Sequence, residues 1–147
     1  MKAAQWLQKF GAALQRGDID AATAMFEPGG YWRDLVSFTW NVKTCEGRAE
    51  IKAMLAATLA RVKPKSFLPK GEDGWFTFET AVGRGVGHVR FRDKKHCWTL
   101  LTTLQELKGY EEKAGVHRDS GVAKNWLEQR QQESAELGGV RPPYVLI

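Results

Sequence analysis

One carboxylate in an aromatic segment, Asp34, is the residue of this sequence best suited to acid–base chemistry. Residues 31–42 are rich in aromatic and β-branched types, which predicts a strand whose alternate side chains share one face. That face would also carry four apolar side chains: Trp32, Val36, Phe38 and Trp40. An apolar environment disfavours the charged form, so the pKa of Asp34 would rise and its carboxyl could act as a general base or acid. The structural alternative is that Asp34 pairs with a nearby Arg or His, or caps a turn.

Two histidines, His88 and His96, are the candidate proton-transfer partners of Asp34. Both fall in a hairpin predicted in the second half of the chain. A histidine that faces Asp34 across a curved sheet could form an acid–base pair, and His88 is our candidate for that catalytic partner. Tyr31 is an alternative group for stabilising a developing oxyanion. An exposed strand position is the alternative for each histidine, and their scattered spacing predicts no metal site.

Aromatic residues are candidates for lining a ligand pocket. The chain has 147 residues with six Trp and seven Phe, which indicates a bulky core, an aromatic cavity or a hydrophobic partner surface. The candidate ligand-binding residues are Trp32, Phe38, Trp40, Tyr31 and Trp98. Such a pocket would bind a small hydrophobic molecule, and core packing is the alternative for each ring.

The segment Gly83–Gly87, Gly-Arg-Gly-Val-Gly, superficially suggests a phosphate-binding loop. Such a loop needs a helix immediately after it, whereas the following residues, up to Arg92, continue a strand pattern. We therefore expect the glycines to mark bends in a long strand.

Charge and cysteine content narrow the class of protein. The net charge is +5, but from Gly109 onward five basic residues face six acidic ones, so the excess lies in the preceding part. Its basic residues fall mostly in predicted loops and no nucleic-acid motif accompanies them, so neither nucleic-acid binding nor, for want of a long apolar run, a membrane span is predicted. Cys45 and Cys97 lack CxxC spacing, which favours free thiols in a cytoplasmic protein.

The elements that must position these residues follow from the periodicity of apolar side chains. In chain order they are helices over 3–15 and after Asp18, strands over 31–42, 75–92 and 97–107, and a helix over 48–62 between the first two strands. Gly17 ends the first helix, and Asp18 caps the second. This order predicts an α+β fold, a cone-shaped curved antiparallel sheet with N-terminal helices packed on one face.

The strand predicted over 97–107 carries apolar side chains on both faces. Leu100 and Leu104 share one face, and Leu101 and Leu107 share the other. A sheet covered by helices on one side should alternate apolar and polar residues, so the second face should also be buried. We therefore predict a homodimer through the outer face of the sheet.

A domain boundary is predicted at Lys108. The polar, glycine-punctuated residues after it are typical of a linker, and Ser120 could cap a helix. The final run Tyr144–Ile147 is typical of the opening of a buried strand. We expect a domain over 1–108 and an extended segment over 109–147, with a linker, a helix and a truncated strand that leads toward a missing domain.

Two motifs, Phe26–Asp34 and Gly47–Ile51, follow the helix pair and read Phe-Glu-Pro-Gly-Gly-Tyr-Trp-Arg-Asp and Gly-Arg-Ala-Glu-Ile. Together they resemble the nuclear-transport-factor-two-like (SnoaL-like) superfamily over about residues 3–108. The resemblance implies a cone-shaped fold whose sheet curls around a pocket, with dimers through the outer sheet face in many members. Isomerases and dehydratases of this superfamily use pocket carboxylates, a role that would fall to Asp34.

A narrower resemblance involves Leu35–Trp40, Leu107–Glu112, Trp126–Arg130 and Pro143–Ile147. These segments are similar to the N-terminal region of flavin-dependent monooxygenase-like proteins, in which the last strand continues into the glycine-rich turn of a dinucleotide-binding domain. That Gly-x-Gly-x-x-Gly turn is absent from this sequence. We therefore predict that this chain holds neither FAD nor NADPH, and no other cofactor.

Two functions fit these observations. The first is a small-molecule-binding and dimerisation module of a flavin monooxygenase-like protein, without catalysis of its own. The second is a stand-alone isomerase, dehydratase or hydrolase that uses Asp34 as its base. An open pocket with a second polar group near Asp34 would favour the enzyme, and a pocket filled by Trp32 or Phe38 would favour the module. A filled pocket beside a large exposed apolar patch would indicate a protein-interaction domain.

Overall fold

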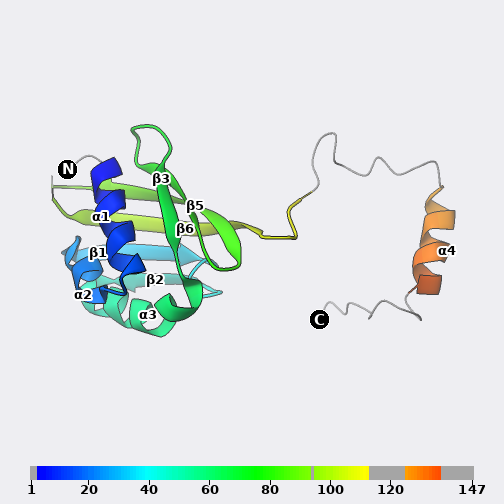
Figure 1. Ribbon diagram of the computed structural model, residues 1–147, viewed down its shortest axis with the longest axis horizontal. Helices are drawn as coiled ribbons and strands as arrows, with labels where there is room; N and C mark the ends of the chain where they lie inside the picture. Colours follow the sequence, from blue (N-terminus) through cyan, green and yellow to red (C-terminus); the bar gives the residue numbers. More distant parts are fainter. Residues whose placement is uncertain (1–2, 94, 113–124, 137–147) are drawn as a thin grey trace. The chain divides into compact units, whose positions relative to one another are not determined.

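The computed structural model describes residues 3–93, 95–112 and 125–136. The chain divides into two compact units, Met1–Glu111 and Glu112–Ile147, and each is described by itself. The first unit holds three helices and six strands in the described residues (Figure 1): α1 (Ala3–Gln15), α2 (Ile19–Ala24), β1 (Phe26–Leu35), β2 (Val42–Glu46), α3 (Gly47–Val62), β3 (Lys65–Pro69), β4 (Trp75–Glu79), β5 (Gly83–Phe91) and β6 (Cys97–Leu107).

The strands form one sheet in the order β2-β1-β6-β5-β4-β3. Neighbours run antiparallel except β1 and β6, which are parallel. Helix α1 packs against β3, and α3 packs against β1 and β2. In Figure 1, α1 crosses in front of the sheet. The predicted α+β cone, a curved sheet with helices on one face, is confirmed, and the parallel pairing of β1 with β6 is the one departure from an antiparallel sheet.

Local chemistry explains where the first two helices begin and end. The buried side chains of α1 recur at helical spacing, so one stripe of the helix faces the core. Gly17 follows with φ +71°, a left-handed conformation that glycine adopts without steric cost. Asp18 then caps α2, because its carboxylate accepts a hydrogen bond of 2.9 Å from the backbone N–H of Ala21.

The prediction of one strand over 31–42 is wrong. Strand β1 ends at Leu35, β2 begins at Val42, and the residues between them form a tight loop. The loop reverses the chain through left-handed backbone at Val36 (φ 68°) and Trp40 (φ 55°). It is closed by a 3.0 Å hydrogen bond from the Val36 N–H to the Asn41 carbonyl oxygen. Side chains after Leu35 therefore do not share a face with Asp34.

The single long strand predicted over 75–92 is also two strands. β4 and β5 are joined by a turn at Thr80, whose N–H donates to the Gly83 carbonyl oxygen over 2.8 Å and whose hydroxyl accepts from the Gly83 N–H over 2.9 Å. The residues from Pro64 to Pro69 supply most of the edge strand β3. The predicted glycine bend is thus a reversal of the chain.

The second unit contributes helix α4 (Trp126–Glu136) to the described residues. Asn125 and Glu128 form a reciprocal cap, in which the Glu128 N–H donates to Asn125 Oδ1 over 3.0 Å and the Asn125 N–H donates to Glu128 Oε2 over 3.2 Å. The predicted linker, the Ser120 cap and the strand at 144–147 lie outside the described residues, apart from residues 109–112. Among the described residues, no helix combines the length and apolarity that a membrane crossing requires.

Candidate functional site

Asp34 lies at the end of β1 with a fully buried side chain. Its Oδ2 accepts hydrogen bonds from the backbone N–H groups of Phe38 (2.9 Å) and Thr39 (2.8 Å). Its Oδ1 accepts from the hydroxyls of Thr102 (2.8 Å) and Ser37. The Thr39 hydroxyl, 2.9 Å from Oδ2, is shared with a backbone carbonyl oxygen of the loop. The carboxylate therefore holds the β1–β2 loop in place, as the turn-capping alternative expected.

The same network continues into the core through Thr102. The indole N–H of Trp32 donates to the Thr102 hydroxyl oxygen over 2.8 Å, and that hydroxyl donates to Asp34. A carboxylate offers about four lone-pair directions, and the donors around Asp34 already occupy them. A substrate proton would have to displace one of these donors, so the arrangement suits a structural carboxylate better than a general base.

The structure does not bring His88 to Asp34. Asp34 and Thr102 point to the inner face of the sheet, and Thr102 pairs with Gly87 across β5 and β6. Side chains alternate along a strand, so His88 points to the outer face. Its ring centroid lies 4.6 Å from that of Trp75, and its Nε2 is 2.8 Å from the Asp73 carbonyl oxygen. The predicted acid–base pair is therefore not formed.

The other two candidate partners also lie away from Asp34. Tyr31 is 38% exposed on the outer face, because it alternates with the buried Trp32. The Nδ1 of His96 is 3.0 Å from a carboxylate oxygen of Asp93 in the exposed β5–β6 turn. No cluster of His, Cys, Asp and Glu among the described residues could hold a metal ion.

The five candidate ligand-binding aromatics do not line a common cavity. Trp32 and Phe38 are fully buried and pack edge to face, with ring centroids 4.9 Å apart. Trp40 is 50% exposed in the β1–β2 loop, and Tyr31 lies on the outer face. Trp98 lies under the Arg92 guanidinium, 3.8 Å from it. Only two of these aromatics therefore point into the cone.

Aromatic rings fill the interior of the cone. Eight of them are buried and connected by ring contacts: Trp6, Phe10, Phe26, Trp32, Phe38, Phe67, Phe76 and Phe78. The inner face of β5 makes room for them with glycines. A Cβ at Gly85 would come within 2.5 Å of the Phe78 ring, and one at Gly87 within 2.2 Å of the Phe76 ring. The Gly-Arg-Gly-Val-Gly motif is thus a packing device.

Three open clefts lie elsewhere on the first unit. The largest, about 740 Å³, lies between α1 and α3, and another of about 700 Å³ lies beside the β3–β4 loop. A shallower one of about 350 Å³ lies over β3, β4, β5 and β6. None of these three is lined by Asp34, Trp32 or Phe38. A ligand site built on the predicted residues would require the core to open.

Both cysteines of the chain are free and buried. Burial raises the pKa of the Cys45 and Cys97 thiols, which reduces the thiolate fraction that reacts with thiol reagents. We expect the native protein to react with Ellman's reagent at least about 100-fold more slowly than the protein in guanidinium chloride, where both thiols react. The rate of colour development measures this difference. Rapid titration of either thiol in the native state would contradict the burial described here.

Comparison with solved structures places this architecture among known folds. A protein of unknown function from Burkholderia pseudomallei, described as NTF2-like, superposes with a TM-score of 0.53 and 16% identity, over 71% of this chain and 92% of that one. The fold is that of NTF2-like proteins. A Xanthomonas campestris protein of unknown function with a cystatin-like fold gives 0.54 and 15%, over 72% and 92%.

A third NTF2-like neighbour carries a ligand. It is a Mycobacterium tuberculosis protein in complex with estradiol-17beta-hemisuccinate, with a TM-score of 0.53 and 12% identity, over 69% of this chain and 93% of that one. No family model matches the sequence, and no curated protein matches it. At these identities the likeness concerns the fold, and the function has to be argued from this chain's own residues.

Proposed function

We propose that this chain is a binding and assembly module without catalysis of its own, and that two copies associate through the outer face of the sheet. The filled cone supports the first part, because aromatic rings occupy the interior in which a cone fold would hold a substrate. The fixed role of Asp34 supports it too, since the carboxylate is engaged by its own loop.

The outer face of the sheet carries the second part of the proposal. One row of laterally paired residues crosses all six strands without a charge: Val42, Leu35, Thr103, Val86, Thr77 and Leu68. We call these six residues the outer row. Their inner-face neighbours point to the core, so the outer row points away from the helices of the first unit. A row of Val, Leu and Thr is typical of sheet faces that pack on another sheet.

The surroundings of the outer row also fit a self-association surface. The shallow cleft of about 350 Å³ lies on this face and is lined by Leu68, Thr77 and Val86. At one end of the face Arg84 pairs with Glu106 and Glu111, each over 2.9 Å, so these charges are already matched within one copy. Two copies related by a two-fold axis could therefore bring the outer rows together with little unpaired charge.

A charge placed in the outer row tests the dimer. We expect sedimentation equilibrium of the wild-type chain at micromolar concentration to give twice the monomer mass of 16.5 kDa. Val86→Lys would place an ammonium group at the centre of the interface in each copy and should raise the dimer dissociation constant by about 100-fold or more. Its matched control is Ala57→Lys, on an exposed position of α3.

The outcomes separate cleanly. A wild-type monomer at micromolar concentration contradicts the proposal, as does equal weakening by the two substitutions. Thermal melting of both variants checks that Val86→Lys still folds. Loss of dimer in a folded Val86→Lys variant supports the outer row as the contact.

The predicted link to flavin-dependent monooxygenases concerns residues partly outside the described ranges and stays a prediction, as does the absence of FAD and NADPH. It is tested by the genomic reading frame: a Gly-x-Gly-x-x-Gly turn within a few residues after position 147 would support it. A stop codon there with no such neighbouring frame would count against it.

A further inference from the structure

The groove between α1 and α3 has the composition of a binding site for an amphipathic anion. This cleft of about 740 Å³ lies on the opposite side of both helices' core contacts from the ring-filled interior. Its floor is apolar, with Leu14, Leu55 and Leu59 buried at its base and Ile19 half-buried at its side. Its volume falls within the range of small-molecule sites, about 300–1,000 Å³.

The groove stays open because of two alanines on α3. Ala56 and Ala60 are one helical turn apart, and both line the cleft with exposed methyl groups. Helix α1 packs against β3 and α2, while α3 packs against β1, β2 and α2. The two helices therefore flank the groove without side chains long enough to close it.

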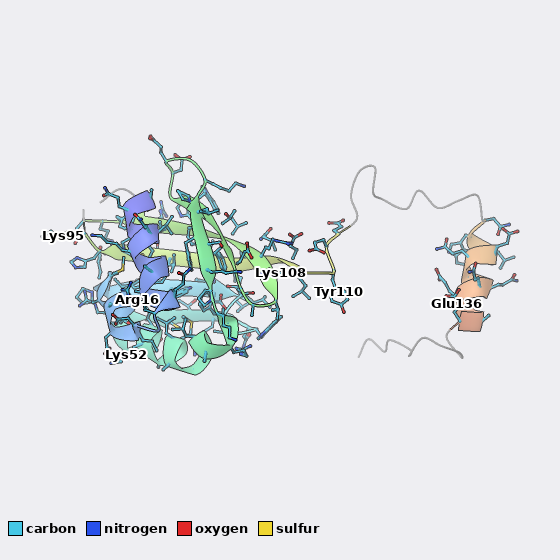
Figure 2. All side chains as sticks on the ribbon, viewed as in Figure 1. Arg16, Lys52, Lys95, Lys108, Tyr110 and Glu136 are labelled. Atoms are coloured by element: carbon cyan, nitrogen blue, oxygen red, sulfur yellow. The ribbon has the colours of Figure 1, made fainter. Side chains whose placement is uncertain are left out.

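Three cations gather at the end of the groove where both helices terminate. Arg16 follows the last residue of α1 (Figure 2), Lys63 is the C-cap of α3, and Lys65 begins β3. All three are exposed and line the cleft. Among the described residues, neither Arg16 nor Lys63 forms an ion pair, and Lys65 lies across from Glu79, which is paired with Lys108 over 2.8 Å.

Helix dipoles explain part of this charge but not all of it. A helix C-terminus carries about half a negative charge, so cations beside two such ends are favourable in any case. Three full positive charges exceed the two half charges that they face. The groove therefore keeps a net positive end beside an apolar floor.

We propose that this groove binds an amphipathic carboxylate such as a fatty acid, with its chain along Leu14, Leu55 and Leu59 and its carboxylate at Arg16 and Lys63. A carboxylate accepts charge-assisted hydrogen bonds from both side-chain types, and an alkyl chain gains from covering the exposed part of the floor. The site lies on the helix side of the unit, so it does not depend on the proposed dimer through the opposite sheet face.

Two probes with the same tail and opposite charge test the site. Isothermal titration should show saturable binding of dodecanoate below its micellar concentration, and at least about tenfold weaker binding of dodecyltrimethylammonium. Arg16→Gln combined with Lys63→Gln should weaken dodecanoate binding by about tenfold or more. Equal binding of the two probes would show non-specific adsorption to apolar surface and overturn the proposal, as would the absence of dodecanoate binding.

A matched pair of double variants tests the location. Ala56→Leu with Ala60→Leu fills the groove and should abolish dodecanoate binding. Ala53→Leu with Ala57→Leu adds the same atoms at the same spacing on exposed positions of α3 that do not line the cleft, and should leave binding unchanged. Because Leu is a good helix former, all four substitutions should be accommodated, which circular dichroism checks. Equal loss in both pairs, or retention in the filled groove, would overturn the assignment.

Discussion

Replacing Asp34 with Ala lowers the free energy of unfolding by about 3–5 kcal/mol. The change leaves the N–H groups of Phe38 and Thr39 without their acceptor, and it removes the partner of the Thr102 hydroxyl inside a buried site. Each buried donor left unsatisfied costs about 1–3 kcal/mol. Asp34→Asn should cost less, because its amide oxygen can still accept from the backbone N–H groups. Urea denaturation followed by tryptophan fluorescence measures both changes.

Asp20 provides the control for this prediction. Its side chain is 78% exposed in α2 and contacts Lys52 across the surface over 2.6 Å. Exposed ion pairs contribute little to stability, so Asp20→Ala should leave the urea midpoint close to the wild-type value. A folded Asp34→Ala variant of wild-type stability would contradict the structural role described here. It would return Asp34 to consideration as a pocket carboxylate.

The elements predicted best from sequence are those that depend on local pattern alone. The helix predicted over 3–15 is observed as Ala3–Gln15, the helix over 48–62 as Gly47–Val62, and the strand over 97–107 as Cys97–Leu107. In each, the spacing of apolar residues sets one face, and a neighbouring glycine, Pro64 or polar turn marks the end. Tertiary contacts then reinforce a preference that the segment already has.

The loop after Asp34 was mispredicted because two local signals compete there. Aromatic and β-branched residues favoured a continuous strand, whereas Ser37, Thr39 and Asn41 are residues that bond the nearby backbone and favour turns. The buried carboxylate decides between them, since it accepts from the loop's own N–H groups. A buried Asp followed by Ser and Thr within five residues is the signal that would have identified the turn.

The side of the sheet on which His88 lies could not be predicted from local pattern. It depends on the turn at Thr80 and on the register of β5 against β6, which shifts at Arg84 and again at Arg90. One residue of slip moves every side chain to the opposite face. A proposed contact between Asp34 and a residue of another strand thus required a register that only tertiary structure supplies.

Gly87→Ala should destabilise the unit by about 2–3 kcal/mol or more, because a single methyl group has no space there. The new Cβ would meet the Phe76 ring at 2.2 Å and the Leu101 carbonyl oxygen at 2.6 Å. Phe76 is fully buried among other rings, so it cannot move without displacing them, and the carbonyl belongs to a paired strand. Differential scanning calorimetry and urea denaturation both measure the loss.

The same substitution at Gly29 should have the opposite sign. Gly29 lies in β1 with no heavy atom within 4 Å of an added Cβ, and its φ is outside the left-handed region. Alanine there mainly restricts the unfolded chain, which typically stabilises by about 0.4–1 kcal/mol. If Gly87→Ala were as stable as Gly29→Ala, the rings would not fill the cone as described. The interior would then have room for a ligand, and the argument against a substrate pocket in the cone would fail with it.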